Sequence, residues 1–168
     1  MLLKPLGVAA AAALLLSAPA FAQEYGPYGY DSGWGLGFDW DGFYSGVYGG
    51  GQPMSDPAAW NAGIFTGVNV TLDSILLGAE AQVGVDVDDN FALDALILAR
   101  GGMTLGDVAV YALGGGGILE GGAGYAVGGG VEYGFTDYLS VRAEALGLAE
   151  WGGGPDEFRL TAGVAFHL

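Results

Sequence analysis

The sequence contains no cysteine, so neither a disulfide nor thiol chemistry can contribute to this protein. Basic residues are almost as scarce: Lys and Arg together number 4 against 19 Asp and Glu, and the formal net charge is −15. Because nucleic-acid phosphates are bound by clustered Lys and Arg, this balance argues strongly against a nucleic-acid partner. The same shortage argues against a peripheral protein that basic residues hold on anionic lipid.

Beyond residue 22 the chain also lacks any apolar run long enough to cross a membrane as a helix. Hydrophobic residues nevertheless make up 52% of the sequence. The 34 glycines disfavour helices further, because each Gly in a helix costs about 1 kcal/mol relative to Ala. High apolar content without helical spans leaves two classes, a soluble all-β protein or a membrane β-barrel.

The first 22 residues have the order of a secretory signal peptide. Lys4 gives a short basic start, residues 6–16 form an apolar run, and Ala20-Phe21-Ala22 supplies small residues for signal peptidase. We therefore expect cleavage before Gln23, which leaves a chain of one-domain size. Cleavage removes the only Lys and leaves three Arg against all 19 acidic residues, a charge of about −16.

Residues 23–41 are rich in Tyr, Gly and Asp, and we expect a flexible leader there. From residue 42 onward the hydrophobicity has a period of two, which is typical of β-strands. It is clearest at 74–88, where seven consecutive apolar positions from Ile75 to Val87 share one face. The other face carries polar or small residues such as Glu80 and Gln82, so the pattern predicts a strand.

Eight segments of this kind follow one another, joined by tight turns that alternate with mostly longer, Gly/Asp/Pro-rich connections. An even number of alternating strands with short turns on one side is the outer-membrane topology. We therefore predict an all-β fold, an eight-stranded antiparallel up-and-down transmembrane β-barrel over residues 42–168. The predicted strands are 43–51, 60–73, 74–87, 91–104 (which alternates poorly and could be mistaken for a helix), 108–117, 122–135, 138–149 and 157–168.

The residues opposite the apolar face are largely Gly, Ala, Ser and Thr, whereas a solvated sheet face would carry many Lys and Glu. Small residues suit the crowded interior of an eight-stranded barrel. Counting from the tight turns puts the charged residues of this face at similar heights. We predict an interior ion-pair network, the alternative being solvated surface charges; its members are Glu80, Arg100, Glu132, Arg142, Glu144 and Arg159.

Aromatic residues gather near the two ends of the predicted strands, at the level where lipid headgroups favour them. We expect two belts facing lipid, the alternative being ordinary core aromatics. The turn-side belt comprises Trp40, Phe43, Tyr133, Phe135, Tyr138 and Phe166. The loop-side belt comprises Trp60, Phe91, Tyr125, Trp151 and Phe158.

Several motifs carry a family resemblance. Residues 40–46 read W-x-G-x-Y-x-G, residues 78–84 read G-x-E-x-Q-x-G, residues 111–115 read Y-x-x-G-G, and residues 127–146 join two strands through a Thr-Asp turn. Together they resemble the small porin-like outer-membrane β-barrel family, known as surface antigens of alphaproteobacteria and related to OmpA-type barrels. The last ten residues resemble the strand that the barrel-assembly machinery recognises, through Leu160, Val164, Phe166 and Leu168.

The resemblance implies a monomer surrounded by outer-membrane lipids and lipopolysaccharide, with both mature termini in the periplasm. Two features depart from the family. Members usually end in Phe, whereas this chain ends in Leu168, and the mature chain is unusually acidic.

Enzyme activity is not expected. His167 is the only histidine, and outer-membrane lipases and acyltransferases need a His paired with a Ser and a carboxylate. Residues 86–90 begin like a calcium loop, but Phe91 stands where Gly is required and Ile97 replaces the bidentate Glu. We therefore expect no metal and no cofactor.

The leading hypothesis is a structural outer-membrane barrel with at most slight permeation, because eight strands leave no open channel. The alternative is a soluble periplasmic or secreted β-barrel that binds an apolar ligand in its interior.

Overall fold

The computed structural model describes residues 37–53, 59–86, 92–155 and 157–168, and these residues form eight strands. Every strand lies within two residues of its predicted bounds, so the predicted strands are confirmed. They are β1 (Gly42–Gln52), β2 (Ala59–Leu72), β3 (Ile75–Asp86), β4 (Leu93–Leu105), β5 (Val108–Leu119), β6 (Gly122–Thr136), β7 (Leu139–Glu150) and β8 (Glu157–His167). The described residues include no helix that is long and apolar enough to cross a membrane.

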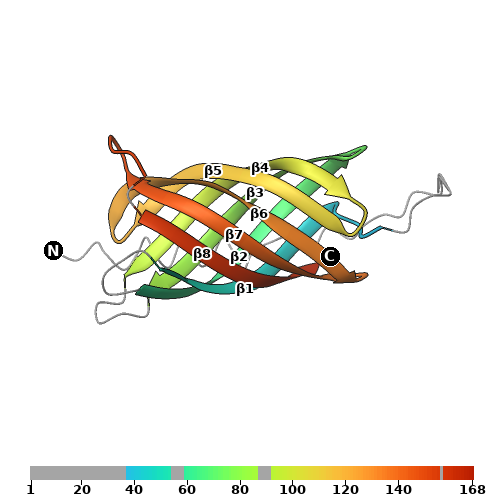
Figure 1. Ribbon diagram of the computed structural model, residues 1–168, viewed down its shortest axis with the longest axis horizontal. Helices are drawn as coiled ribbons and strands as arrows, with labels where there is room; N and C mark the ends of the chain where they lie inside the picture. The colour runs from blue at the N-terminus through green and yellow to red at the C-terminus, as the bar shows by residue number, and fades with distance from the viewer. Residues whose placement is uncertain (1–36, 54–58, 87–91, 156) are drawn as a thin grey trace. The chain divides into compact units, whose positions relative to one another are not determined.

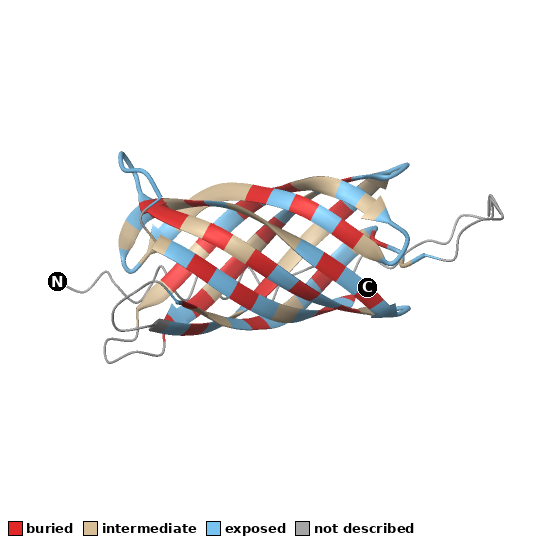
Figure 2. Cartoon of the chain, viewed as in Figure 1, coloured by how far each residue is buried: buried red, intermediate tan, exposed pale blue. Residues whose placement is uncertain are grey.

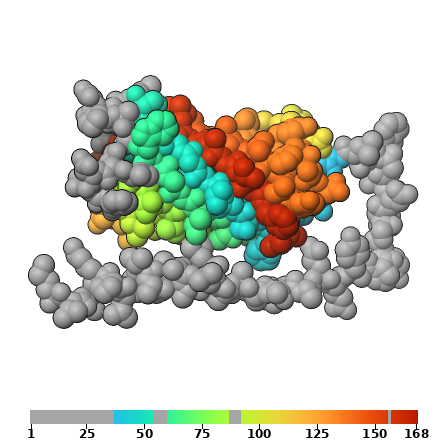
Figure 3. All heavy atoms as spheres, turned by 90° about the horizontal axis from the view of Figure 1, so that it is seen from below, coloured from blue at the N-terminus to red at the C-terminus, as the bar shows by residue number. Residues whose placement is uncertain are grey.

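Each strand pairs antiparallel with its neighbours in the sequence, and β1 pairs with β8, which closes the barrel (Figure 1). The space-filling view shows this seam, with β8 in red running between β1 in cyan and β7 in orange (Figure 3). The predicted closed, eight-stranded antiparallel barrel is therefore confirmed. Closure removes the unpaired strand edges that would otherwise template aggregation.

The connections define the two ends of the barrel. The turns between β2 and β3, β4 and β5, and β6 and β7 lie at one end with the chain's last residue, and we refer to this as the turn end (Figure 1). The opposite ends of the strands form the loop end. Asp73 and Gly106 have φ values of 57° and 65°, which two-residue hairpin turns require.

Burial alternates along most of each strand and is interrupted mainly at glycines, as the checkered colouring shows (Figure 2). In β3, Leu76, Glu80 and Gln82 are buried inside the barrel, whereas Ile75 and Leu77 are half exposed on the outside. Since side chains point to opposite faces with a period of two, each strand contributes one inward and one outward row. The strands thus carry their apolar row outside, and most of the charged residues within the strands lie on the inward row.

The interior also contains apolar layers that the sequence analysis did not predict. Six leucines point inward with Tyr111 and two alanines between them: Leu76, Leu96, Leu98, Leu113, Leu146 and Leu148. Inward leucines explain the weak alternation of β4, because Leu96 and Leu98 face the interior while Ile97, between them, faces out. At residues 95–99 both faces of that strand are apolar, so its period is hidden there.

Inward glycines make room for the large inward side chains. A Cβ on Gly67 would lie 2.4 Å from the Tyr44 hydroxyl, and one on Gly84 would lie 2.2 Å from the Tyr48 hydroxyl. An eight-stranded barrel has an interior just wide enough for side chains. Each large residue therefore needs an empty position opposite it, which accounts for much of the glycine content.

The predicted leader, 23–41, overlaps the described residues at 37–41, and there the expectation of flexibility is corrected. Trp40 is only 3% exposed, and its indole Nε1 donates a hydrogen bond of 3.0 Å to the carbonyl of Gly106 at the turn end. Trp40 therefore lies inside the barrel mouth and does not belong to the outer aromatic belt. Its apolar ring gains more contact inside the mouth than it would at the rim.

Candidate functional site

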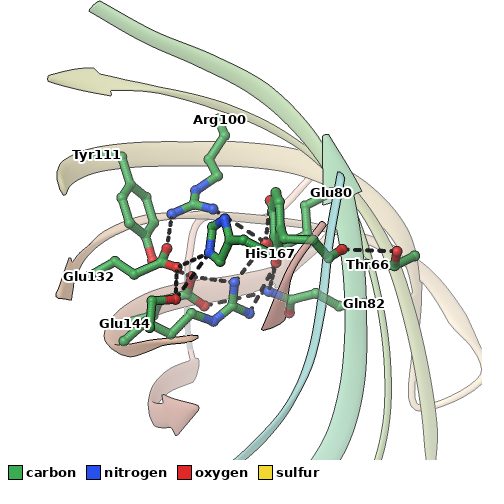
Figure 4. Close-up of polar contacts among 11 residues, drawn as sticks. Thr66, Glu80, Gln82, Arg100, Tyr111, Glu132, Glu144 and His167 are labelled. Atoms are coloured by element: carbon green, nitrogen blue, oxygen red, sulfur yellow. Dashed lines mark hydrogen bonds and ion pairs between the residues drawn. The ribbon is translucent and has the colours of Figure 1, made fainter. Parts of the chain in front are cut away.

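The centre of the barrel holds a buried charged cluster, which we call the central network (Figure 4). Glu80 of β3 receives two hydrogen bonds from Arg142 of β7, at 2.6 and 3.1 Å. The Tyr44 hydroxyl and the Gln82 amide each donate to the same carboxylate at 2.7 Å. Bidentate Arg–carboxylate contacts of this kind fix geometry as well as charge.

Two more carboxylates complete the central network. Glu132 accepts hydrogen bonds from Arg100 and Ser140, and His167 Nε2 lies 3.2 Å from it. Glu144 accepts a 2.8 Å hydrogen bond from the Tyr111 hydroxyl and lies 3.4 Å from Arg142 Nη1. Three carboxylates therefore face two guanidinium groups, and hydroxyl and amide donors satisfy the remaining oxygen atoms.

Aromatic rings cover both guanidinium groups of the central network. The Arg142 guanidinium carbon lies 3.3 Å from the Phe65 ring centroid, and that of Arg100 lies 3.7 Å from the Tyr111 centroid. A desolvated cation over a ring face gains about 2 kcal/mol or more. The rings thus stabilise the same two guanidinium groups that form ion pairs with the carboxylates.

Arg159 belongs to a second cluster rather than to the central network, and this part of the prediction is corrected. Its Nη2 lies 2.6 Å from Asp94 and 3.9 Å from Asp86, both near the loop end. With its amide oxygen turned toward Arg159, Asn61 accepts from Nε at 2.9 Å and from Nη1 at 3.1 Å. The other five predicted residues, Glu80, Arg100, Glu132, Arg142 and Glu144, do come together.

The sequence analysis missed the uncharged members of both clusters. Tyr44, Tyr111, Gln82, Ser140 and Asn61 all occupy inward positions, so strand parity alone places them inside. Parity does not say which inward residues meet across the barrel. That pairing depends on the stagger of strands that are distant in the sequence.

The barrel brings together one His, one Ser and one carboxylate, the residue types of a hydrolytic triad. In a triad the two ring nitrogens have separate roles, one facing the nucleophile and the other facing the carboxylate. Here Nε2 of His167 contacts both Ser140, at 3.1 Å, and Glu132, at 3.2 Å. Ser140 donates to Glu132 and is fully buried, so the three groups lack the geometry of a triad.

We predict that Tyr111→Phe destabilises the barrel by about 1.5–3 kcal/mol, the usual range for a hydrogen bond to a charged group. The substitution removes the only atom by which this side chain donates to Glu144. Urea unfolding followed by tryptophan fluorescence measures the effect. Tyr125→Phe is the matched control, because that hydroxyl donates to the Gly153 carbonyl in an exposed setting. Equal losses for both variants would contradict the buried role of Tyr111.

The described belt residues other than Trp40 lie on the outside, where all are exposed except Tyr125, which is half-buried. Trp60 and Trp151 are 68% and 66% exposed near the loop end, where Tyr125 packs 5.6 Å from Trp151. Phe91 lies outside the described residues. The remaining belt residues and the last-strand residues point outward, namely Phe43, Tyr133, Phe135, Tyr138, Phe158, Leu160, Val164, Phe166 and Leu168.

Within the part of the chain that the structure describes, no group of three or more His, Cys, Asp or Glu could hold a metal ion. Of the acidic stretch 86–90, only Asp86 is described. Comparison of the sequence with protein-family models and with curated proteins finds no match.

Proposed function

We propose that the chain is a structural protein of the outer membrane, an integral β-barrel of the small porin-like type. In this proposal lipid hydrocarbon surrounds the outward rows, lipopolysaccharide packs against the loop half, and the turn end faces the periplasm. The barrel-assembly machinery reads the outward row of β8, and the folded protein is a monomer.

The observation that carries the proposal is the chemistry of the outer face. Among the outward positions of the eight described strands, none is Asp, Glu, Lys, Arg, Asn or Gln. The aliphatic hydroxyls there are Ser45, Thr66 and Thr136. Thr66 donates its proton to the Tyr44 carbonyl, and Thr136, which a bulge pairs with the outward Leu139, accepts from the Leu139 backbone N–H. Soluble monomers expose contiguous apolar patches of only a few hundred Å². A face that is apolar around the whole barrel suits hydrocarbon.

The height of the barrel agrees with a membrane span. β3 has 12 residues, and at about 3.3 Å per residue with a tilt near 40° it rises about 30 Å along the axis. Outer-membrane barrels present an apolar band about 25 Å tall between two aromatic girdles. The exposed Trp60 and Trp151 at the loop end, and Phe135 and Tyr138 at the turn end, lie where such girdles belong.

The interior argues against the ligand-carrier alternative and against free permeation. A carrier of apolar molecules needs an empty interior and a polar exterior, whereas this barrel has a filled interior and an apolar exterior. Its interior is filled by the central network, by six leucines and by Tyr44, Tyr48 and Phe65. We therefore propose at most slight permeation.

Cell fractionation tests the proposal directly. The native protein should pellet with the outer membrane, and its unboiled form should migrate differently from the boiled form on denaturing gels. Both results follow from a closed barrel whose outside requires lipid or detergent. Recovery in the soluble periplasmic fraction, with an extractable apolar ligand, would instead support the carrier.

A further inference from the structure

Residues 37–41 enter the turn end of the barrel without joining the strand ladder, and we call them the strap. β1 begins at Gly42, whose backbone φ of 103° is one that residues with a side chain rarely adopt. A Cβ there would also approach the Leu168 carbonyl to 3.0 Å. Gly42 therefore lets the chain leave the direction of β1 and turn into the mouth.

The strap is held by a small set of specific contacts. Trp40 Nε1 donates to the Gly106 carbonyl at 3.0 Å, and the Phe38 backbone N–H donates to Asp107 Oδ1 at 3.0 Å. The two strap rings pack 4.5 Å apart. Both meet the edge or face of His167, at 4.7 Å from Phe38 and 5.8 Å from Trp40.

The barrel provides a space shaped for these rings. Gly134 of β6 points inward at the turn end, and a Cβ there would lie 2.1 Å from the Phe38 ring and 2.6 Å from Phe38 Cβ. Together with Gly106, Asp107 and His167 it forms what we call the seat. The seat offers a flat glycine floor, an aromatic wall, a carbonyl acceptor and a carboxylate acceptor.

We propose that the seat is a binding site for a peptide segment of the form aromatic-X-aromatic, occupied in cis by Phe38-Asp39-Trp40. The carbonyl of Gly106 selects an indole N–H, and Asp107 selects the backbone N–H of the first aromatic residue. The strap thereby closes the turn end of the barrel while it is bound in the seat, and it opens that end when it leaves. The seat needs only the folded barrel and is independent of where the barrel resides.

Release of the strap changes what the turn end exposes. His167 lies directly under both strap rings, and behind it are Ser140 and Glu132 of the central network. The ring nitrogen Nδ1 of His167 has no hydrogen-bond partner among the described residues. An open seat therefore gives water, or another aromatic segment, access to the polar end of the lumen.

The occupied seat can be tested in the full chain with Trp34, Trp60 and Trp151 replaced by Phe, so that only Trp40 fluoresces. In this parent, Trp40 should be well shielded from acrylamide. Gly134→Ala should raise the quenching constant several-fold and shift the emission to the red, because the added methyl occupies the place of Phe38. Gly114→Ala is the matched control, since its outward Cβ meets nothing closer than 3.7 Å.

Two results would overturn the proposal: strong quenching of Trp40 in the parent, or unchanged shielding in Gly134→Ala with a normal heat-shifted gel band. If Gly134→Ala fails to fold, Phe38→Ala gives the same test, because Phe38 lies outside the strand ladder.

The binding specificity is tested by adding the peptide Gly-Phe-Asp-Trp-Asp to the same full-length parent, with Phe38→Ala and Trp40→Ala added, whose seat is empty and which contains no tryptophan. The emission of the peptide should change saturably, and adding Gly134→Ala to the protein should weaken binding at least several-fold. A peptide with both aromatics replaced by Ala has no tryptophan and serves as a competitor that should not displace the first. Binding that is indifferent to Gly134→Ala, or displacement by the Ala peptide, would refute the seat.

Discussion

Arg142→Met should lower the free energy of unfolding by about 3–5 kcal/mol, the range for breaking a buried ion pair by removing one partner. Arg142 donates two hydrogen bonds to Glu80 and lies 3.4 Å from Glu144, and all three side chains are almost fully buried. Without the guanidinium, two neighbouring carboxylates remain in an interior that water barely reaches. The contact with Phe65 is lost as well.

Urea unfolding of the protein folded in phospholipid vesicles measures this loss. Arg142→Lys keeps the charge but not the bidentate geometry, so we expect a smaller loss than for Met. The double variant with Glu80→Gln removes one unpaired carboxylate and should recover part of the stability. Exposed ion pairs contribute about 0–1 kcal/mol. A loss within that range for Arg142→Met would mean that the central network is solvated.

On the proposed membrane location, Val47→Arg should destabilise the barrel by about 2–4 kcal/mol, the cost of an Arg on the lipid face near the bilayer midplane. Val47 is 59% exposed at the middle of β1 and pairs with Ile64 and Val164 on the adjacent strands. An apolar neighbourhood on both sides leaves the guanidinium without a partner. In water the same substitution at an exposed position would change stability by about 0.5 kcal/mol or less.

The depth dependence of this effect separates lipid from water. Ile118→Arg introduces the same charge at an exposed position one residue from the loop end of β5. Near the interface the expected cost is about 0–1 kcal/mol. Vesicle-folded protein should therefore show a clear difference between the two variants in urea. Equal and negligible costs at both depths would favour a soluble barrel.

The strands were predictable because their signal is local. In β3 and β8 the outward rows are apolar and the inward rows are mostly polar or small, so a period of two gives both the strand and its faces. Short Asp- and Gly-containing connections at 73–74 and 106–107 then fix which strands are neighbours. β4 was the weakest prediction, because its inward row contains Leu96 and Leu98.

The partners inside the barrel were only partly predictable. Counting residues from the tight turns put Glu80 and Arg142 at the same height, and they pair. The same counting put Arg159 slightly higher but still within one network, whereas Arg159 pairs with Asp94 in a separate cluster. Height along a strand is a one-dimensional measure, but the barrel is staggered and tilted. Two residues at similar counts can therefore lie on different levels.

The sequence by itself determined the eight strands, their order and which face of each strand points outward. Alternation and turn chemistry act between residues that are close along the chain, so they can be read locally. Only the tertiary structure decided which inward groups meet and where Trp40 lies. Nothing local to residues 37–41 encodes the mouth that receives them, since the seat is assembled from Gly106, Asp107, Gly134 and His167. These residues come from the β4–β5 turn, β6 and β8, and only closure of the barrel brings them together.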